Sequence, residues 1–152
     1  MRYTQGQVRD LLSIPIETFR TWREVIPALA EHRGHGPTFL PGDVVALAVM
    51  THIIRALGVR VSTVREQLGD LFESCKNLSW LALEPCFAVV GPTSGRLVLV
   101  GELDRAVLDS GAFVVPCRPI VTRLRTQLLE AQPETVQGQL HFPPQAVAAT
   151  GR

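Results

Sequence analysis

Residues 3–8 read Tyr-Thr-Gln-Gly-Gln-Val, and this stretch has the pattern of a capped helix start. The hydroxyl of Thr4 can accept a hydrogen bond from the amide of Gln7, and the Gln7 side chain can reach back to the amide of Thr4. The apolar residues that follow fall at helical spacing, at Val8, Leu11 and Leu12. We therefore expect a short amphipathic helix over residues 3–12.

Residues 16–23 read Ile-Glu-Thr-Phe-Arg-Thr-Trp-Arg, and they predict a second helix over residues 15–25. Pro15 suits a helix start, because its missing N–H needs no partner in the first turn. Phe19 and Trp22 can form the buried side of this helix. Its other faces then carry four polar residues, Thr18, Arg20, Thr21 and Arg23. Two short helices joined by a tight turn are typical of a helix-turn-helix, so DNA binding through the second helix is the leading hypothesis.

The composition is that of a globular protein. At 152 residues with 46% hydrophobic content, the chain can hold one full domain or two small ones with a core. No apolar run reaches the roughly 18–20 residues that a membrane span needs, and no apolar segment of a signal peptide follows Arg2. We expect a cytoplasmic protein without a membrane partner.

The charge distribution does not by itself favour nucleic acid. The net charge of the chain is +1, and residues 1–73 hold eight arginines against eight acidic residues. Affinity for DNA depends on arginine and lysine side chains that neutralise phosphates, so any positive surface has to be local. The candidates are Arg20 and Arg23 on the second helix, followed by Arg33 and His35 in the segment after it.

The reactive residues show no pattern of an enzyme or of a metal site. Cys75, Cys86 and Cys117 are widely spaced, and we expect them to serve as small apolar residues of the core. Ser94 lies in a glycine-bounded stretch, but no Gly-Lys-Ser/Thr follows, so a hairpin turn is the better interpretation. We expect no catalytic activity, no cofactor and no bound metal.

The remaining part of the first half predicts a loop and two helices. Residues 27–40 contain repeated glycine and proline and predict a loop or short hairpin. Residues 41–57 predict a mostly apolar helix that ends at Gly58. Apolar residues at helical spacing predict an amphipathic helix over residues 61–73.

The pattern changes after about residue 76. We expect the two strands of a β-hairpin, a short helix, a third strand and an amphipathic helix, over residues 87–90, 97–100, 103–108, 112–116 and 119–131. The hairpin loop is predicted to hold five or six residues. The chain is therefore predicted to be α+β, with a DNA-binding domain over residues 1–73, a small α+β unit over residues 77–131 and a flexible tail over residues 132–152.

Residues 3–73 resemble the MerR family of winged-helix transcription regulators. The resemblance rests on the order and spacing of five short motifs, Tyr3-Thr4-x-Gly6-x-Val8, Glu17-Thr18-x-Arg20-x-Trp22, Phe39 with Asp43-Val44, Arg55-x-Leu57-Gly58-Val59 and Val64-Arg65-Glu66-x-Leu68. It implies a winged helix-turn-helix of four helices and a wing.

The resemblance also implies a mode of action. MerR-like proteins are dimers whose second helices enter successive major grooves of double-stranded DNA while the wings contact the backbone. Carried over by position, the wing covers residues 30–39, and RNA polymerase is a further partner. The residues expected at the DNA are Thr18, Arg20, Thr21, Arg23, Arg33 and His35.

The chain departs from the family pattern in four places. Pro15 stands where the family often has a capping serine, and Thr21 replaces a common aromatic residue. Pro37 stands where the family usually has an arginine in the wing, and the long dimerisation helix of the family is not evident after residue 73. We expect the unit over residues 77–131 to serve dimerisation, or the sensing of an effector or partner. The apolar face of its last helix, Ile120, Leu124 and Leu128, is predicted to form the dimer interface or to pack on the sheet.

Two other functions fit the same residues. An excisionase-like accessory protein that bends DNA shares the winged-helix layout, but such small proteins rarely carry a second folded unit. A protein-interaction adaptor could keep the helix-turn-helix scaffold without affinity for DNA. The zero net charge of residues 1–73 and the absent wing arginine favour the adaptor.

Overall fold

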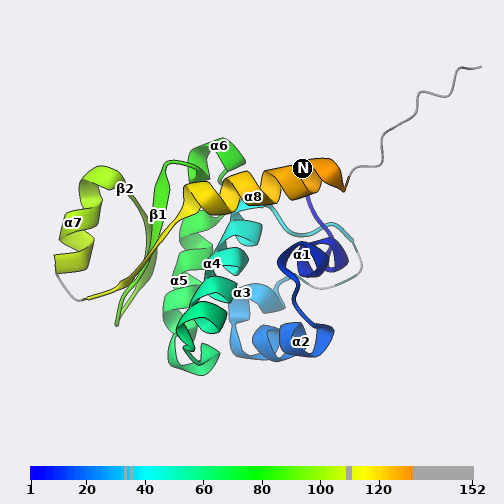
Figure 1. Cartoon of the computed structure of the whole chain (residues 1–152). Coiled ribbons are helices and arrows are strands. Elements are labelled where there is room, and N and C mark those ends of the chain that lie inside the picture. The colour runs from blue at the N-terminus through cyan, green and yellow to red at the C-terminus, as the bar shows by residue number, and fades with distance from the viewer. Residues whose placement is uncertain (33, 35, 109–110, 132–152) are drawn as a thin grey trace, which may run out of the picture.

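The computed structural model describes residues 1–32, 34, 36–108 and 111–131, and its architecture is α+β (Figure 1). Several helices precede a three-stranded antiparallel sheet, and a long helix follows it. The elements are α1 (Gln5–Leu12), α2 (Ile16–Val25), α3 (Pro27–Ala30), α4 (Pro41–Leu57), the 3₁₀ turn η1 (Val61–Thr63), α5 (Arg65–Cys75), α6 (Trp80–Leu83), β1 (Cys86–Val90), β2 (Gly95–Leu99), α7 (Val100–Leu108), β3 (Phe113–Pro116) and α8 (Cys117–Glu130).

The predicted capping box of α1 is confirmed. The Gln7 amide donates to the Thr4 hydroxyl over 3.2 Å, and the Thr4 amide donates to the Gln7 side chain over 2.9 Å. The helix ends at Ser13, which adopts a left-handed conformation with φ of 53°. The guanidinium of Arg55 donates to the carbonyls of Leu12 and Ser13 over 3.3 and 2.8 Å. Arg55 therefore ties the turn between α1 and α2 to the end of α4.

Helix α4 runs through the middle of the molecule with the predicted bounds. Its residues from Gly42 to Thr51 are all buried, which explains why the sequence is apolar on every side of this helix. Asp43 accepts a hydrogen bond from the Leu40 amide over 2.8 Å and so caps the first turn. Gly58 ends the helix with φ of 66°, a conformation that glycine adopts at little cost.

The prediction of a loop or hairpin over residues 27–40 was wrong in its first part. Pro27–Ala30 form the short helix α3, because proline suits the first position of a helix and the next three residues favour helix. In the described part of residues 31–40, the β-type pairing consists of one isolated bridge between Phe39 and Tyr3. Both amide-to-carbonyl bonds of this bridge form, over 2.8 and 3.0 Å.

The sheet has the strand order β2-β1-β3, and both pairings are antiparallel. The hairpin between β1 and β2 was predicted correctly, but its loop has the four residues 91–94 instead of five or six. β2 begins at Gly95, two residues before the predicted start. At Gly95 the backbone of the strand lies close against the backbone of helix α5. A Cβ atom on Gly95 would lie 1.9 Å from the carbonyl oxygen of Gln67.

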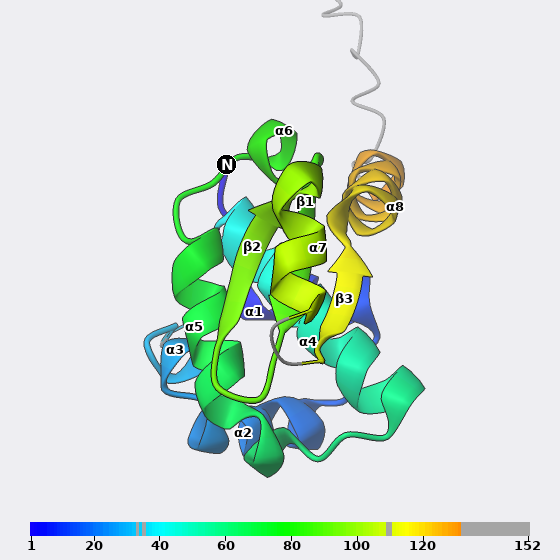
Figure 2. The same cartoon turned by 90° about the vertical axis from the view of Figure 1, so that its left-hand side faces the viewer.

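The sheet lies between two layers of helix. Ala88, Val90 and Val115 face the main core toward α4 and α5. The opposite face carries Val89 and Val98, which pack against Leu103 and other side chains of a small second cluster. Figure 2 shows α7 in front of the sheet and α5 beside β2.

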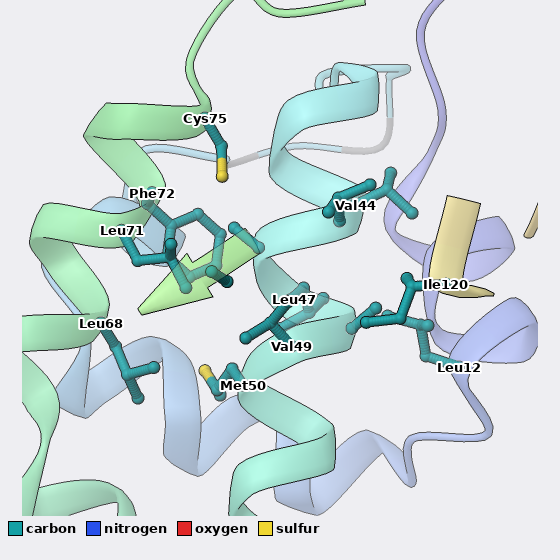
Figure 3. Packing of buried hydrophobic residues seen from close by; sticks show 14 of the residues in the cluster. Leu12, Val44, Leu47, Val49, Met50, Leu68, Leu71, Phe72, Cys75 and Ile120 are labelled. Carbon is teal, nitrogen blue, oxygen red and sulfur yellow. The ribbon is translucent and has the colours of Figure 1, made fainter. Parts of the chain in front are cut away.

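The main core is continuous across the predicted boundary between residues 73 and 77. Helix α4 packs against α5 and also against α8. Figure 3 shows Leu68, Leu71 and Phe72 on one side of α4 and Ile120 with Leu12 on the other. The sheet and α8 are therefore part of the same hydrophobic core as the N-terminal helices. In the described residues, no helix is both long and apolar enough to cross a membrane.

The apolar face of α8 packs within the chain. The exposed fraction is 8% for Ile120 and zero for Leu124, and Leu128 is partly buried against the same core. These three residues were predicted to form a dimer interface or to pack internally. Burial of Ile120 and Leu124 within one chain fits internal packing, and the dimer interface stays a prediction. Their apolar spacing reflects contact with α4 and α1.

Candidate nucleic-acid interface

Helix α2 has one buried and one open side, as its sequence predicts. Phe19 is fully buried and Trp22 has an exposed fraction of 4%. Phe19 also meets Phe39 edge-to-face, with ring centroids 6.2 Å apart. Arg20 and Thr21 are exposed on the other side of the helix. The packing of two large aromatic side chains thus determines which polar residues α2 presents to solvent.

The predicted residues Arg20 and Arg23 line a shallow concavity of about 480 Å³. The first turn of α1 forms another wall, through Gln5 and Gly6. Arg23 reaches across to this turn, with Nη1 3.5 Å from the side-chain oxygen of Gln5. The lining also includes Thr4 before α1, Ile16 at the start of α2 and Gly34 of the following loop. Helices α1 and α2 and the loop therefore meet around two guanidinium groups.

This arrangement has the chemistry of an anion site. Guanidinium groups form charge-assisted, often bidentate, hydrogen bonds with phosphate oxygens. Backbone N–H groups at a helix N-terminus also favour negative charge, and the first turn of α1 lies at the same concavity. The residues Gln5, Gly6 and Gly34 were not among the predicted contacts. The capping box marks where α1 begins, but only the tertiary structure places that end beside Arg23.

On the solvent-exposed side of α2, two residues of the same helix form an ion pair. Arg20 Nη1 lies 3.0 Å from Glu17 Oε1, and the two side chains are 57% and 76% exposed. The hydroxyl of Thr21 donates to the carbonyl of Glu17 over 3.1 Å. An exposed pair of this kind contributes on the order of 0.2–1 kcal/mol, so it opens at little cost when a stronger anion approaches. Thr18 and Arg23 are both half-buried, so neither side chain is as accessible as that of Arg20.

The base of the predicted wing is ordered by an aromatic stack. His32 lies flat on Phe39, with ring centroids 4.1 Å apart and an angle of 17° between the planes. His32 Nε2 also lies 3.8 Å from Asp43 Oδ2. Arg33 and His35, two of the predicted contacts, lie outside the described residues. Gly34, which stands between them in the chain, lines the concavity with Arg20 and Arg23.

A second groove, of about 510 Å³, lies between α3 and α5 and differs in charge. Its lining includes four carboxylates and one arginine, Glu31, Glu66, Asp70, Glu73 and Arg65. Carboxylates repel phosphate, so this groove is not a place for the DNA backbone. Among the described residues, no group of three or more histidine, cysteine, aspartate or glutamate side chains could hold a metal ion.

Comparisons of the chain with protein-family models, with curated proteins and with solved structures find no match. The resemblance to MerR proteins therefore rests on the five sequence motifs.

Proposed function

We propose that this protein is a sequence-specific, double-stranded DNA-binding transcription regulator of the MerR-like winged-helix type, and that it acts as a dimer. The observation that carries the proposal is the concavity in which Arg20 and Arg23 of α2 meet the first turn of α1. Buried Phe19 and Trp22 hold α2 so that its polar side faces outward. These features support a role for helix α2 as the recognition helix.

In this proposal α2 enters the major groove. Arg20 is the more accessible of the two arginines on α2. Its guanidinium leaves the ion pair with Glu17 and binds a guanine edge or a phosphate instead. Thr21 and Thr18 contact neighbouring groups on the same side of the helix. The concavity beside α1 receives a backbone phosphate, which fixes the position of the helix on the duplex. The loop around Gly34 then lies toward the flanking backbone.

The low net charge of α2 limits how many phosphate groups the helix can contact. Helix α2 carries Glu17 and Glu24 against Arg20 and Arg23, which sum to zero. A small number of phosphate contacts therefore has to supply the electrostatic part of the affinity. We expect binding that is detectable at low salt and weakens strongly as salt increases.

The test is fluorescence anisotropy at low salt, first with a labelled random duplex and then with DNA from upstream of the protein's own coding region. Arg20→Ala should weaken binding about 5- to 150-fold, which corresponds to the roughly 1–3 kcal/mol of one good arginine contact. Arg123→Ala is the matched control, because Arg123 is an exposed arginine on α8, on the opposite side of the molecule from α2 (Figure 1). Equal loss in both variants would contradict a role for α2.

The dimer is tested separately by light scattering of the full chain. Because Ile120 and Leu124 are buried within the chain, the variant Leu129→Arg is more informative than any change at those positions. Leu129 is 69% exposed on α8, so this charge can oppose association without opening the core. A full-length protein that is monomeric at every concentration would remove the dimer from the proposal, and with it a palindromic operator.

A protein-interaction adaptor is the second candidate, and the charge balance of α2 supports it. The exposed Arg20–Glu17 pair is the kind of polar surface that a protein partner can also meet. The two functions separate in the binding experiment. If the protein does not bind duplex DNA even at low salt, the regulator proposal fails and the result supports the adaptor.

A further inference from the structure

Two cysteines that are far apart in the sequence lie at the end of the pairing between β1 and β3. Strand β1 pairs with β3 in the register Phe87↔Pro116, Ala88↔Val115 and Val90↔Phe113. The paired register ends at Phe87↔Pro116, so Cys86 and Cys117, the first residue of α8, are the next residues beyond that last pair. Directly opposed residues of an antiparallel pair have Cα atoms about 4.5–5.5 Å apart. This spacing lies within the roughly 4.4–6.8 Å found across disulfides.

Both side chains also lie on the same face of the sheet. Cys86 alternates with Ala88 and Val90, and Cys117 alternates with Val115. All of these residues belong to, or pack against, the main core cluster. The thiols of Cys86 and Cys117 are close enough for the charge of one to raise the pKa of the other. The same kind of coupling also links Cys75 to both of these thiols, so the register and the shared face are what single out Cys86 and Cys117 as a pair.

We infer that Cys86 and Cys117 form a dithiol site that closes an intrachain disulfide when a low-molecular-weight disulfide such as oxidised glutathione is present. This inference is independent of the proposed function, since it involves neither α2 nor DNA. Both cysteines are free thiols in the structure.

The reaction proceeds by two exchanges. The Cys86 thiolate attacks one sulfur of oxidised glutathione, and a glutathione thiolate leaves as the mixed disulfide forms. The Cys117 thiolate then attacks the Cys86 sulfur, the Cys86–Cys117 bond forms, and the second glutathione leaves. The two protons of the protein thiols go to the two glutathione thiolates. One oxidised glutathione is thereby reduced to two reduced molecules, and the protein loses two hydrogens.

Cys86 is the point of entry for the oxidant. It is half-buried, whereas Cys117 is fully buried. Its thiol donates to the carbonyl of Ala82 over 3.3 Å, in an exposed hydrogen bond. Cys117 then acts as the resolving thiol from inside the core. Burial raises the pKa of Cys86 and raises the pKa of Cys117 to about 11, so exchange is slow at neutral pH and faster at mildly alkaline pH.

Cys75 is the competing partner, and its position disfavours it. It is fully buried at the end of α5, and burial raises its pKa further than that of Cys117. A Cβ atom on Gly42 would lie 1.9 Å from the Cys75 carbonyl oxygen, so the end of α5 is packed tightly onto α4. No strand register places Cys75 opposite either of the other two cysteines.

The disulfide would join the start of α8 to β1. Helix α8 packs on α4 and α1, so the bond would hold the C-terminal helix onto the core. The closed loop runs from residue 86 to residue 117. A cross-link of this length should raise the melting temperature by up to about 10 °C. An oxidised protein would therefore be more resistant to unfolding than a reduced one.

The test treats the folded, full-length protein with oxidised glutathione at mildly alkaline pH, blocks the remaining thiols and maps the tryptic peptides without reduction. Trypsin separates the three cysteines, because it cuts after Arg65, Lys76, Arg96, Arg105 and Arg123 but not between Arg118 and Pro119. The expected product joins peptide 77–96 to peptide 106–123, is about 2 Da lighter than the two reduced peptides together, and separates on reduction. Peptide 66–76 should carry a blocked Cys75.

Two variants strengthen the test. Cys86→Ser should abolish the bridge and the rise in melting temperature, whereas Cys75→Ala should keep both. Three results would overturn the inference: a bridge that contains peptide 66–76, a protein that accumulates only the mixed disulfide on Cys86, or a bridge between two chains. The wild-type peptide map alone decides between these results if a variant fails to fold.

Discussion

Replacement of Gly95 by alanine tests the close contact between the sheet and helix α5. A Cβ atom at this position would lie 1.9 Å from the carbonyl oxygen of Gln67 and 2.9 Å from its carbonyl carbon. A third contact, at 3.2 Å from the Cβ of Leu71, is also tight. Two of these three atoms belong to the α5 backbone and cannot move aside by a change of rotamer. The strand or the helix has to shift by more than about 1 Å, which is overpacking of the core.

We expect Gly95→Ala to lower the free energy of unfolding by about 3 kcal/mol, the upper part of the usual range for overpacking. For a chain of this size, the melting temperature should fall by roughly 6–12 °C. Urea unfolding followed by circular dichroism gives the free energy, and thermal unfolding gives the temperature.

Gly69→Ala is the matched control, and its expected sign is opposite. Gly69 lies inside α5, and apart from its chain neighbours and the nearby backbone of the helix itself, no described atom lies within 4 Å of the Cβ that alanine would add. Alanine favours helix over glycine by about 1 kcal/mol, so this variant should be more stable than the wild type. If Gly95→Ala unfolds at the wild-type urea concentration while Gly69→Ala is stabilised, the close packing of β2 on α5 is wrong.

Two further predictions concern the turn after α1 and the buried thiols. Arg55→Ala removes both hydrogen bonds to the carbonyls of Leu12 and Ser13 and should cost about 1–2 kcal/mol of stability in urea, whereas Arg60→Ala on the exposed turn after α4 should change little. Burial raises the pKa of Cys117 from its ordinary value of 9.0 to about 11, so the unfolded chain loses this proton first. Stability should be complete below pH 9 and fall as pH rises toward 11. Cys117→Ala should show a smaller fall, and an unchanged pH profile in that variant would contradict the burial of the thiol.

Helix ends were predictable where a capping pattern marks them, because capping depends on residues close together in the chain. Without such a pattern the ends were missed, as for α7, which begins at Val100 and not at Leu103. The Thr4–Gln7 capping box and Gly58 placed the start of α1 and the end of α4 correctly. The order β1, β2, α7, β3 and α8 also followed from local patterns, but the short helix α6 was not predicted. Predictions were less accurate where the sequence of a short segment is compatible with two kinds of local structure. Pro27–Ala30 fits a loop as well as a helix, and burial of Leu29 selects the helix.

The candidate interface could be predicted only in part. The spacing of Phe19 and Trp22 indicated which side of α2 is buried, and therefore that Arg20 and Thr21 are open. The approach of Gln5 and Gly6 to Arg23 could not be predicted, because it depends on the angle at which α1 and α2 pack. The capping of the turn by Arg55 likewise joins residues more than forty positions apart.

The sequence by itself determined the α+β class, the two-sided character of α2 and the amphipathic nature of α8, since each depends on the period of apolar residues. Only the tertiary structure decided what the apolar faces contact. Ile120 and Leu124 have the pattern of a dimer seam, yet they are buried on α4 and α1 within one chain. Cys86 and Cys117 become neighbours only through the register of β1 and β3. The physical reason is the same in both cases: periodicity is local, whereas partners are chosen by the packing of segments far apart in the chain.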